Sequence, residues 1–185
     1  APDPSSQIAC TIGGNVAENS GGVHCLKYGL TVHNLLKVKG FTVEGEPIEF
    51  GSEALDAPGY DLMALITGSE GMLAVTTEVT VRLCPKPRLA RCIMASFSDV
   101  RHAGDAVAAV IAAGIIPAGL EMMDKPMTAA VEDFVQAGYD LDAAAILLCE
   151  SDGTPEEVAE EIERMTQVLT AAGATKIAVS ESEAE

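Results

Sequence analysis

Residues 91–114 read RCIMASFSDVRHAGDAVAAVIAAG, a short apolar run that is followed by a longer amphipathic one. The first part, 91–97, is typical of a strand. Residues 99–113 predict a helix that ends at Gly114. The apolar side chains of this helix fall on one face, at Ala103, Val107, Val110 and Ile111. A strand that leads directly into an amphipathic helix predicts a layer of helices packed on a sheet.

The same alternation continues through the rest of the chain. We predict further strands at residues 118–123, 144–150 and 176–180. Asp124 can cap a helix that ends at Gly138. Its expected inner face consists of Met127, Ala130, Val131, Phe134 and Val135. Thr154 and Glu157 form a capping box around a proline, which predicts a second helix that ends at Gly173. The order βαβ, extra helix, βαβ predicts a ferredoxin-like α+β sandwich.

The residues before this region predict a separate unit. Pro85 and Pro87 end a strand and stiffen a connector, so we expect domains of residues 1–86 and 87–185. In the first domain, residues 35–43 and 48–50 flank a turn and predict a hairpin. Residues 75–83 alternate between two faces, which predicts a half-buried strand. Its expected inner side consists of Val75, Thr77, Val79, Val81 and Leu83.

The bulk composition excludes several classes of protein. The 185 residues are 48% hydrophobic and 4% aromatic, so they can bury a core of mostly aliphatic side chains. The formal net charge of −17 repels nucleic acid and anionic lipid, and we expect neither as a partner. It also repels an anionic substrate unless basic groups gather at the site. We find no signal peptide, and no apolar run approaches the ~20 residues that a membrane span needs.

Cysteine and histidine usage points to a reduced, metal-free protein. The five cysteines are odd in number and contain no CxxC pair, which is typical of free thiols in the cytoplasm. His24, His33 and His102 lack metal-ligand spacing, and the sequence offers them no evident acid partner. We therefore predict no metal site.

The segment 11–22, TIGGNVAENSGG, is the first candidate for a binding site. Its four glycines permit positive φ and let the backbone approach a ligand, so a flat ring or a phosphate could lie against its N–H groups. Asn15 and Asn19 add side-chain donors and acceptors. A pair of ordinary surface turns is the alternative. The segment is neither a P-loop nor a GxGxxG fingerprint.

Two acidic residues are further candidates for a functional role. Glu70 lies between glycines in a tight bend that could aim its carboxylate, although an ordinary turn from loop to strand explains the same pattern. Glu121 stands in an apolar strand, where an acid is costly unless it is paired or functional.

Taken together and in order, several segments resemble the FAD-linked oxidase family with the vanillyl-alcohol-oxidase type of flavin domain. Within that family they are most similar to the FAD-binding subunits of bacterial glycolate oxidases. The segments are residues 2–6, 11–22, 25–31, 58–62, 68–73, 85–87, 119–124 and 145–150. One of these motifs alone would be weak, but the ordered set spans essentially the whole chain and is specific.

The resemblance implies an α+β protein in which a partial, PCMH-type FAD-binding domain precedes a ferredoxin-like α/β sandwich that caps the flavin. It implies that FAD is the cofactor, with contacts from Asp3, Thr11, Gly13, Gly14, Asn15, Glu18, Asn19, Gly22, Glu70 and Val75. Members of the family move a hydride from a small 2-hydroxy acid to the flavin and pass the electrons on. The implied partners are such an acid, glycolate first, and other glycolate oxidase subunits.

The chain departs from the family pattern in two respects. Ala74 stands where the family usually has glycine. The family's first FAD loop would lie upstream of Ala1, and its substrate arginine and metal-binding histidines downstream of Glu185. We therefore expect an internal fragment without assigned catalytic residues, and we expect the isolated chain to bind FAD weakly or not at all.

Other readings of the sequence remain open. The parent's substrate could be D-lactate or D-2-hydroxyglutarate, because the pocket residues fall mostly outside the chain. The ferredoxin-like half could instead belong to a non-catalytic module that docks other subunits, since this fold serves many roles. A nicotinamide dehydrogenase is disfavoured because its fingerprint is missing.

Overall fold

The computed structural model describes residues 3–54 and 59–181. Pro2 and Pro58, which belong to the segments that carry the resemblance, lie outside these residues. The chain separates into two compact units, Ala1–Pro85 and Lys86–Glu185, and each is described by itself. The boundary that the sequence predicts falls one residue later, after 86. Within the described ranges, every helix is too short or too polar to traverse a bilayer.

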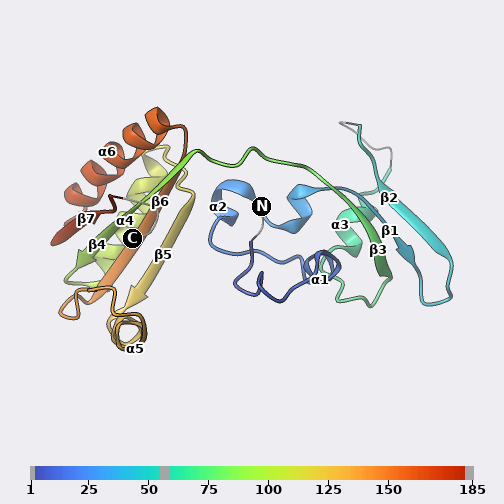
Figure 1. Ribbon diagram of the computed structural model, residues 1–185, viewed down its shortest axis with the longest axis horizontal. Helices are drawn as coiled ribbons and strands as arrows, with labels where there is room; N and C mark the ends of the chain where they lie inside the picture. The colour runs from blue at the N-terminus through green and yellow to red at the C-terminus, as the bar shows by residue number, and fades with distance from the viewer. Residues whose placement is uncertain (1–2, 55–58, 182–185) are drawn as a thin grey trace. The chain divides into compact units, whose positions relative to one another are not determined.

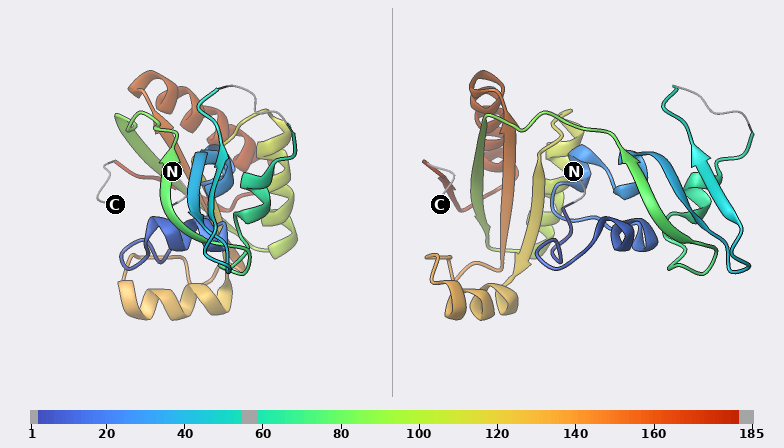
Figure 2. Two further views of the ribbon diagram at one scale, coloured as in Figure 1. Left: turned by 90° about the vertical axis from the view of Figure 1, so that its right-hand side faces the viewer. Right: turned by 45° about the vertical axis from the view of Figure 1, so that its right-hand side comes forward.

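The second unit is a four-stranded antiparallel sheet with helices on one face (Figure 1). Its strands are β4 (Leu89–Phe97), β5 (Gly119–Asp124), β6 (Ala145–Gly153) and β7 (Lys176–Val179), in the order β5-β6-β4-β7. This is the strand order of a ferredoxin-like sandwich, so the prediction of an α+β fold of this type is confirmed. Figure 2 shows α4 (Val100–Ala112) and α6 (Pro155–Ala171) on one face, whereas α5 (Lys125–Val135) lies at one end of the sheet.

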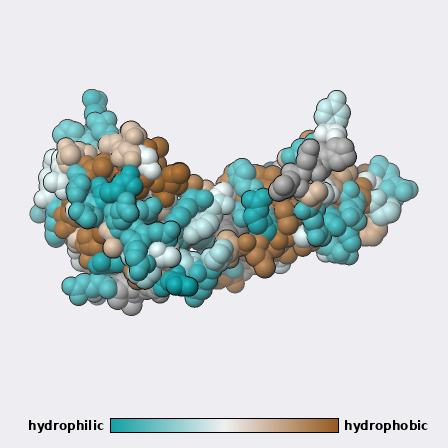
Figure 3. All heavy atoms as spheres, turned by 90° about the horizontal axis from the view of Figure 1, so that it is seen from above, coloured by the Kyte–Doolittle hydropathy of each residue, from teal (hydrophilic) through white to brown (hydrophobic). Residues whose placement is uncertain are grey.

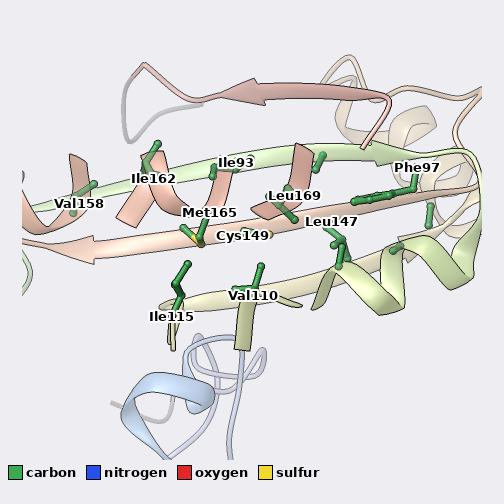
Figure 4. Close-up of a cluster of buried hydrophobic side chains, with 14 residues drawn as sticks. Ile93, Phe97, Val110, Ile115, Leu147, Cys149, Val158, Ile162, Met165 and Leu169 are labelled. Atoms are coloured by element: carbon green, nitrogen blue, oxygen red, sulfur yellow. The ribbon is translucent and has the colours of Figure 1, made fainter. Parts of the chain in front are cut away.

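The core of this unit fills the space between the sheet and the two covering helices (Figure 4). Ile93 and Phe97 of β4 and Leu147 and Cys149 of β6 point to the same layer as Met165 of α6, and all five are fully buried. Thr154 starts α6 as predicted, because its hydroxyl accepts from the N–H of Glu157 while the Glu157 carboxylate accepts from the N–H of Thr154.

Helix α5 differs from its prediction. Four of its five expected inner residues are exposed, namely Met127 (54%), Ala130, Phe134 (89%) and Val135 (50%). Thr128 is buried instead, and its hydroxyl donates to the main-chain oxygen of Asp124 at 2.9 Å. The helix ends at Val135 with Gln136 in the left-handed region, before the predicted end at Gly138.

Glu121 also differs from its expectation. It lies on β5, an edge strand, and is exposed, so its carboxylate is not desolvated and needs no partner to offset burial.

The first unit is built on a three-stranded antiparallel sheet in the order β2-β1-β3. The predicted hairpin is present as β1 (Leu35–Phe41) and β2 (Pro47–Gly51). Strand β3 (Val75–Val81) pairs with the other side of β1. A small core joins this sheet to the helices α1 (Ile12–Glu18) and α3 (Leu62–Ile66). Two short helical segments, α2 (Cys25–Tyr28) and η1 (Thr31–Asn34), connect α1 to β1.

Strand β3 is less buried than its alternation predicts. Val75 is 64% exposed and Leu83 87% exposed, and Val79 is the residue of the expected inner side that packs on the core. The pairing explains this difference. Lys39 lies opposite Glu78 and Gly40 opposite Thr76, so Thr77 is an extra residue that breaks the alternation. Hydrophobic residues also reach the surface elsewhere, and Figure 3 shows them on both units.

Candidate functional site

A groove of about 310 Å³ lies in the first unit between α1 and β3. One wall comes from the start of α1 and the other from the segment that leads into β3. The residues that line it are Thr11, Gly13, Gly14, Ala17, Ile66, Ser69, Gly71, Ala74, Val75 and Thr76. The structure thus brings together four of the residues that the resemblance implies for FAD, namely Thr11, Gly13, Gly14 and Val75.

The glycines at this groove act through their missing side chains. None of the four glycines of the segment 11–22 has positive φ, so the left-handed backbone that these glycines permit is not used here. Gly13 and Gly14 lie within α1, which the sequence did not predict. Thr11 starts that helix, because its hydroxyl accepts from the N–H of Gly14 at 3.0 Å. The lack of Cβ atoms then leaves the groove open beside the helix backbone.

The loop around Glu70 is attached to α1 by its main chain. The N–H of Gly68 donates to the oxygen of Val16, and the N–H of Glu70 donates to the oxygen of Ala17, both at 2.8 Å. Glu70 has a φ of 54°, and its side chain is exposed. The neighbours Ser69 and Gly71 line the groove, so this bend shapes one wall through its backbone.

Three further predicted residues belong to the local framework of α1. Asn19 ends the helix with a φ of 48°, and its Oδ1 accepts from the N–H of Val32 at 3.0 Å. Asn15 is buried, with 9% of its surface exposed, and Glu18 is exposed. The structure does not bring these three residues to the lining of the groove.

Asp3 and Gly22 meet at a second place in the same unit. A Cβ built on Gly22 would lie 2.0 Å from the main-chain oxygen of Asp3, so the two backbones are in direct contact. The Oδ2 atom of Asp3 lies 2.5 Å from Nδ1 of His24. His24 therefore has the acid partner that the sequence did not reveal. The 21 residues that separate the two side chains explain why spacing gave no signal.

The lining of the groove is uncharged. It is lined by hydroxyl, glycine and aliphatic residues, and no charged side chain is among them. Hydroxyls and backbone groups suit both a flat ring and the oxygen atoms of a nucleotide. In the part of the chain that the structure describes, no cluster of acidic, histidine or cysteine side chains could hold a metal ion.

The clearest shifts in acidity lie in the second unit, among the cysteines. Burial, together with a smaller effect of the neighbouring Cys92, raises the pKa of Cys149 to about 12. Burial likewise raises the pKa of Cys92. Both thiols are therefore neutral at physiological pH, which fits packing and not nucleophilic chemistry.

A second, larger hollow of about 580 Å³ lies beside β2 and α3. Its lining includes Glu49, Tyr60 and Arg82, but none of the residues that the resemblance implies for FAD. The smaller groove is the better candidate, because four predicted residues converge on it.

Two family models match the chain. The model described as "FAD linked oxidases, C-terminal domain" matches residues 86–185, and the model described as "FAD binding domain" matches residues 1–51. The chain belongs to the FAD-linked oxidase family. The resemblance stated from the sequence is therefore confirmed. FAD is the cofactor that both descriptions indicate.

The matches to curated relatives in this FAD-linked oxidase family extend along the whole chain. The chain is 64% identical over 185 residues to glycolate oxidase subunit GlcD of Escherichia coli K12. This match covers 100% of the chain and 37% of that relative. It is 39% identical to glycolate oxidase subunit GlcD of Bacillus subtilis, again over 100% of the chain and 39% of that relative. A D-lactate dehydrogenase of Anaerostipes hadrus is 30% identical over 99% of the chain and 40% of that relative. The chain thus spans about two fifths of these relatives.

Solved structures share the fold at low sequence identity. An alkyldihydroxyacetonephosphate synthase has a TM-score of 0.80 at 21% identity over 98% of the chain and 36% of its own. A p-cresol methylhydroxylase has a TM-score of 0.75 at 16% identity over 98% of the chain and 41% of its own. At these identities the likeness concerns the fold alone.

Proposed function

We propose that this chain is part of an FAD-dependent 2-hydroxy-acid dehydrogenase, with glycolate as the substrate. The observation that carries the proposal is the 64% identity to a glycolate oxidase subunit, which runs without interruption through both units. In the proposed arrangement, residues 1–86 are the later part of the FAD-binding domain. Residues 87–185 are the first part of the cap that covers the flavin.

The groove of the first unit is the proposed contact surface for one part of the FAD. Its glycines permit close approach, and the hydroxyls of Thr11, Ser69 and Thr76 offer hydrogen bonds. FAD, when bound, supplies the group that accepts the hydride from the α-carbon of the substrate. The chain's own residues bind and orient that cofactor. At about 310 Å³ the groove is at the small end of ligand pockets, which fits a surface that holds only part of a large cofactor.

The remaining predicted residues have different proposed roles. Asn19 and the main chain of Glu70 form hydrogen bonds that hold the end of α1 and its neighbouring bend, so their proposed role is to act on the cofactor through the backbone. Ala74, which replaces the usual glycine, is 6% exposed and places its methyl group in the groove wall. We propose that this methyl group narrows the groove without closing it.

The proposed electron acceptors are other subunits of a glycolate oxidase. The subunit names of the relatives support this assignment. A cytoplasmic location is proposed as well, because the sequence has an odd number of cysteines and no CxxC pair.

The substrate assignment can be tested by steady-state turnover. The complete reading frame that encodes this chain is expressed, and reduction of an artificial electron acceptor is measured with glycolate, D-lactate and D-2-hydroxyglutarate. The proposal expects the highest kcat/KM with glycolate. A preference for D-lactate would retain the family and change the substrate, which the matches to D-lactate dehydrogenases make a definite alternative. No turnover with any 2-hydroxy acid would contradict the proposed activity and favour the docking module.

A further inference from the structure

Helix α5 presents an apolar stripe to solvent. Met127, Ala130 and Phe134 follow one another at spacings of three and four residues, which places them on one side of the helix. All three are exposed, and Phe134 is exposed over 89% of its surface. A different side of α5 packs on β5 and β6, with Thr128 buried there. Figure 2 shows the helix at one end of the sheet, away from α4 and α6. We call the three exposed residues the α5 stripe.

The α5 stripe has the composition of a binding surface. A single exposed apolar residue is ordinary, but here a methionine and a phenylalanine are aligned at helical spacing. Both residue types are enriched at protein interfaces, and the flexible methionine adapts to the shape of a partner. Anchors at positions i, i+3 and i+7 are also the pattern by which an amphipathic helix is bound in a groove of another protein. The stripe therefore fits a groove on a partner better than it fits solvent.

The helix that carries the stripe is fixed at both ends. The Asp124 side chain accepts a hydrogen bond from the N–H of Met127 at 3.0 Å and so starts the helix. The Glu132 carboxylate accepts from the N–H groups of Gly138, at 2.9 Å, and Tyr139, at 3.1 Å, and so holds the segment that follows the helix. A surface that is already ordered loses little conformational freedom when a partner binds.

The charge around the stripe selects the kind of partner. Between residues 121 and 142, Lys125 is the single basic residue, and the acidic residues number six, namely Glu121, Asp124, Glu132, Asp133, Asp140 and Asp142. A second copy of the chain would bring like charges face to face, which is unfavourable, and an anionic lipid surface would be repelled in the same way. The complementary surface has lysine and arginine side chains around an apolar groove.

We propose that the α5 stripe docks in an apolar groove, bordered by lysine and arginine side chains, on another subunit of the glycolate oxidase. The inference rests on the proposed function, which includes such subunits but gives no surface of this chain that binds them. Phe134 is the central anchor, because it is the most exposed residue of the stripe. Asp133, which precedes it and is also exposed, lies beside the stripe and faces the basic border of the groove.

Photo-crosslinking identifies what covers the stripe. The complete reading frame is co-expressed with the other glycolate oxidase subunits of the same organism, and Phe134 is replaced by p-benzoylphenylalanine. Val43 is the matched control position, because it is also 89% exposed and lies in the turn between β1 and β2. We expect position 134, and not position 43, to crosslink to a peptide of another subunit that contains lysine or arginine. A crosslink within the same polypeptide, a crosslink to a second copy, or none at all would overturn the proposal.

Affinity measurements with the purified partner subunit test the anchors and the charge separately. Replacing both Met127 and Phe134 by alanine, which favours the helix, is expected to raise the Kd at least about tenfold, whereas Val43→Ala should leave it unchanged. Asp133→Lys should raise the Kd at low salt, with a smaller effect as the salt concentration rises. Glu160→Lys, at an exposed position of α6, is the charge control. An unchanged Kd in the α5 variants, or equal effects in the controls, would contradict the assignment.

Turnover with an artificial electron acceptor separates this inference from the proposed function. The α5 variants are expected to oxidise glycolate with the kcat/KM of the wild type, because the artificial acceptor bypasses the partner subunit. Wild-type turnover together with unchanged partner affinity in the α5 variants would overturn the inference alone. A wild-type protein that oxidises no 2-hydroxy acid would overturn both. Circular dichroism and the thermal midpoint identify a variant that fails to fold, and Phe134→Ala alone, at the most exposed position of the stripe, then carries the comparison.

Discussion

Gly22 lies against Asp3 at a distance that only a glycine permits, because an added Cβ would stand 2.0 Å from the main-chain oxygen of Asp3. The contact joins the N-terminal segment to the end of the glycine-rich segment. We predict that Gly22→Ala lowers the free energy of unfolding by about 1–3 kcal/mol, the usual cost of an overpacked site. Chemical denaturation of the purified protein measures this. A variant as stable as the wild type would contradict the close contact.

Gly13→Ala is expected to separate stability from ligand binding. Its added Cβ would lie 3.8 Å from the oxygen of Thr76, an ordinary contact, and alanine favours the helix by up to about 1 kcal/mol. The fold is therefore expected to be as stable as the wild type or more so. The methyl group enters the proposed cofactor groove, however, so FAD affinity in the complete protein should fall. A rise in stability with unchanged FAD affinity would remove the groove from the cofactor site.

The thiols should differ in reactivity. Cys84 is exposed, whereas Cys149 is buried and has a pKa of about 12. At pH 8, we expect a maleimide reagent to label Cys84 first and to leave Cys149 unmodified until the protein unfolds. Mass spectrometry of peptides gives the order of labelling. Labelling of Cys149 in the native protein at the rate of Cys84 would contradict the described core.

The same thiol makes the second unit sensitive to alkali. The pKa of Cys149 is raised in the folded state above its ordinary value of 9.0, so its contribution to stability is present below about pH 9 and is lost as the pH rises toward 12. Denaturation curves between pH 8 and 11 should show this loss. Cys149→Ala removes the thiol that titrates, so the stability of the variant should depend less on pH. The variant is expected to be less stable overall, because the smaller side chain leaves a cavity.

The capping box of α6 is expected to contribute measurably to the free energy of unfolding. Thr154→Ala removes the hydroxyl that accepts from Glu157 and should cost about 1 kcal/mol of stability. Thr170→Ala is the matched control, because Thr170 is an exposed threonine in the same helix. It should change stability by less than about 0.5 kcal/mol. Equal effects of the two substitutions would contradict a specific role for the cap.

The sequence predicted the second unit well because its signals are local. Asp124 and Thr154 begin helices where capping chemistry places them, and the apolar spacing of α6 identifies its buried side. The orientation of α5 was mispredicted because its apolar residues face outward while Thr128 is inside. Amphipathic spacing alone cannot show that a helix leaves its apolar side uncovered.

Only part of the candidate site could be predicted from the sequence, and the reason is different. Thr11, Gly13 and Gly14 could be named from their motif, but their conformation could not. Glycine-rich segments suggest loops, and the cap at Thr11 makes this one a helix. The Asp3–His24 contact had no periodicity or spacing to reveal it, because it depends on the tertiary fold. The extra residue Thr77 in β3 likewise arises from pairing and not from the strand's own alternation.

The measurement that tests the central claim most directly is an anaerobic titration of the complete protein with glycolate, followed by visible absorption. The account predicts a flavin spectrum in the purified protein, and bleaching of the visible band of oxidised flavin as glycolate is added. A protein that carries no flavin, or a flavin that no 2-hydroxy acid reduces, would contradict the assignment of this chain to a 2-hydroxy-acid dehydrogenase.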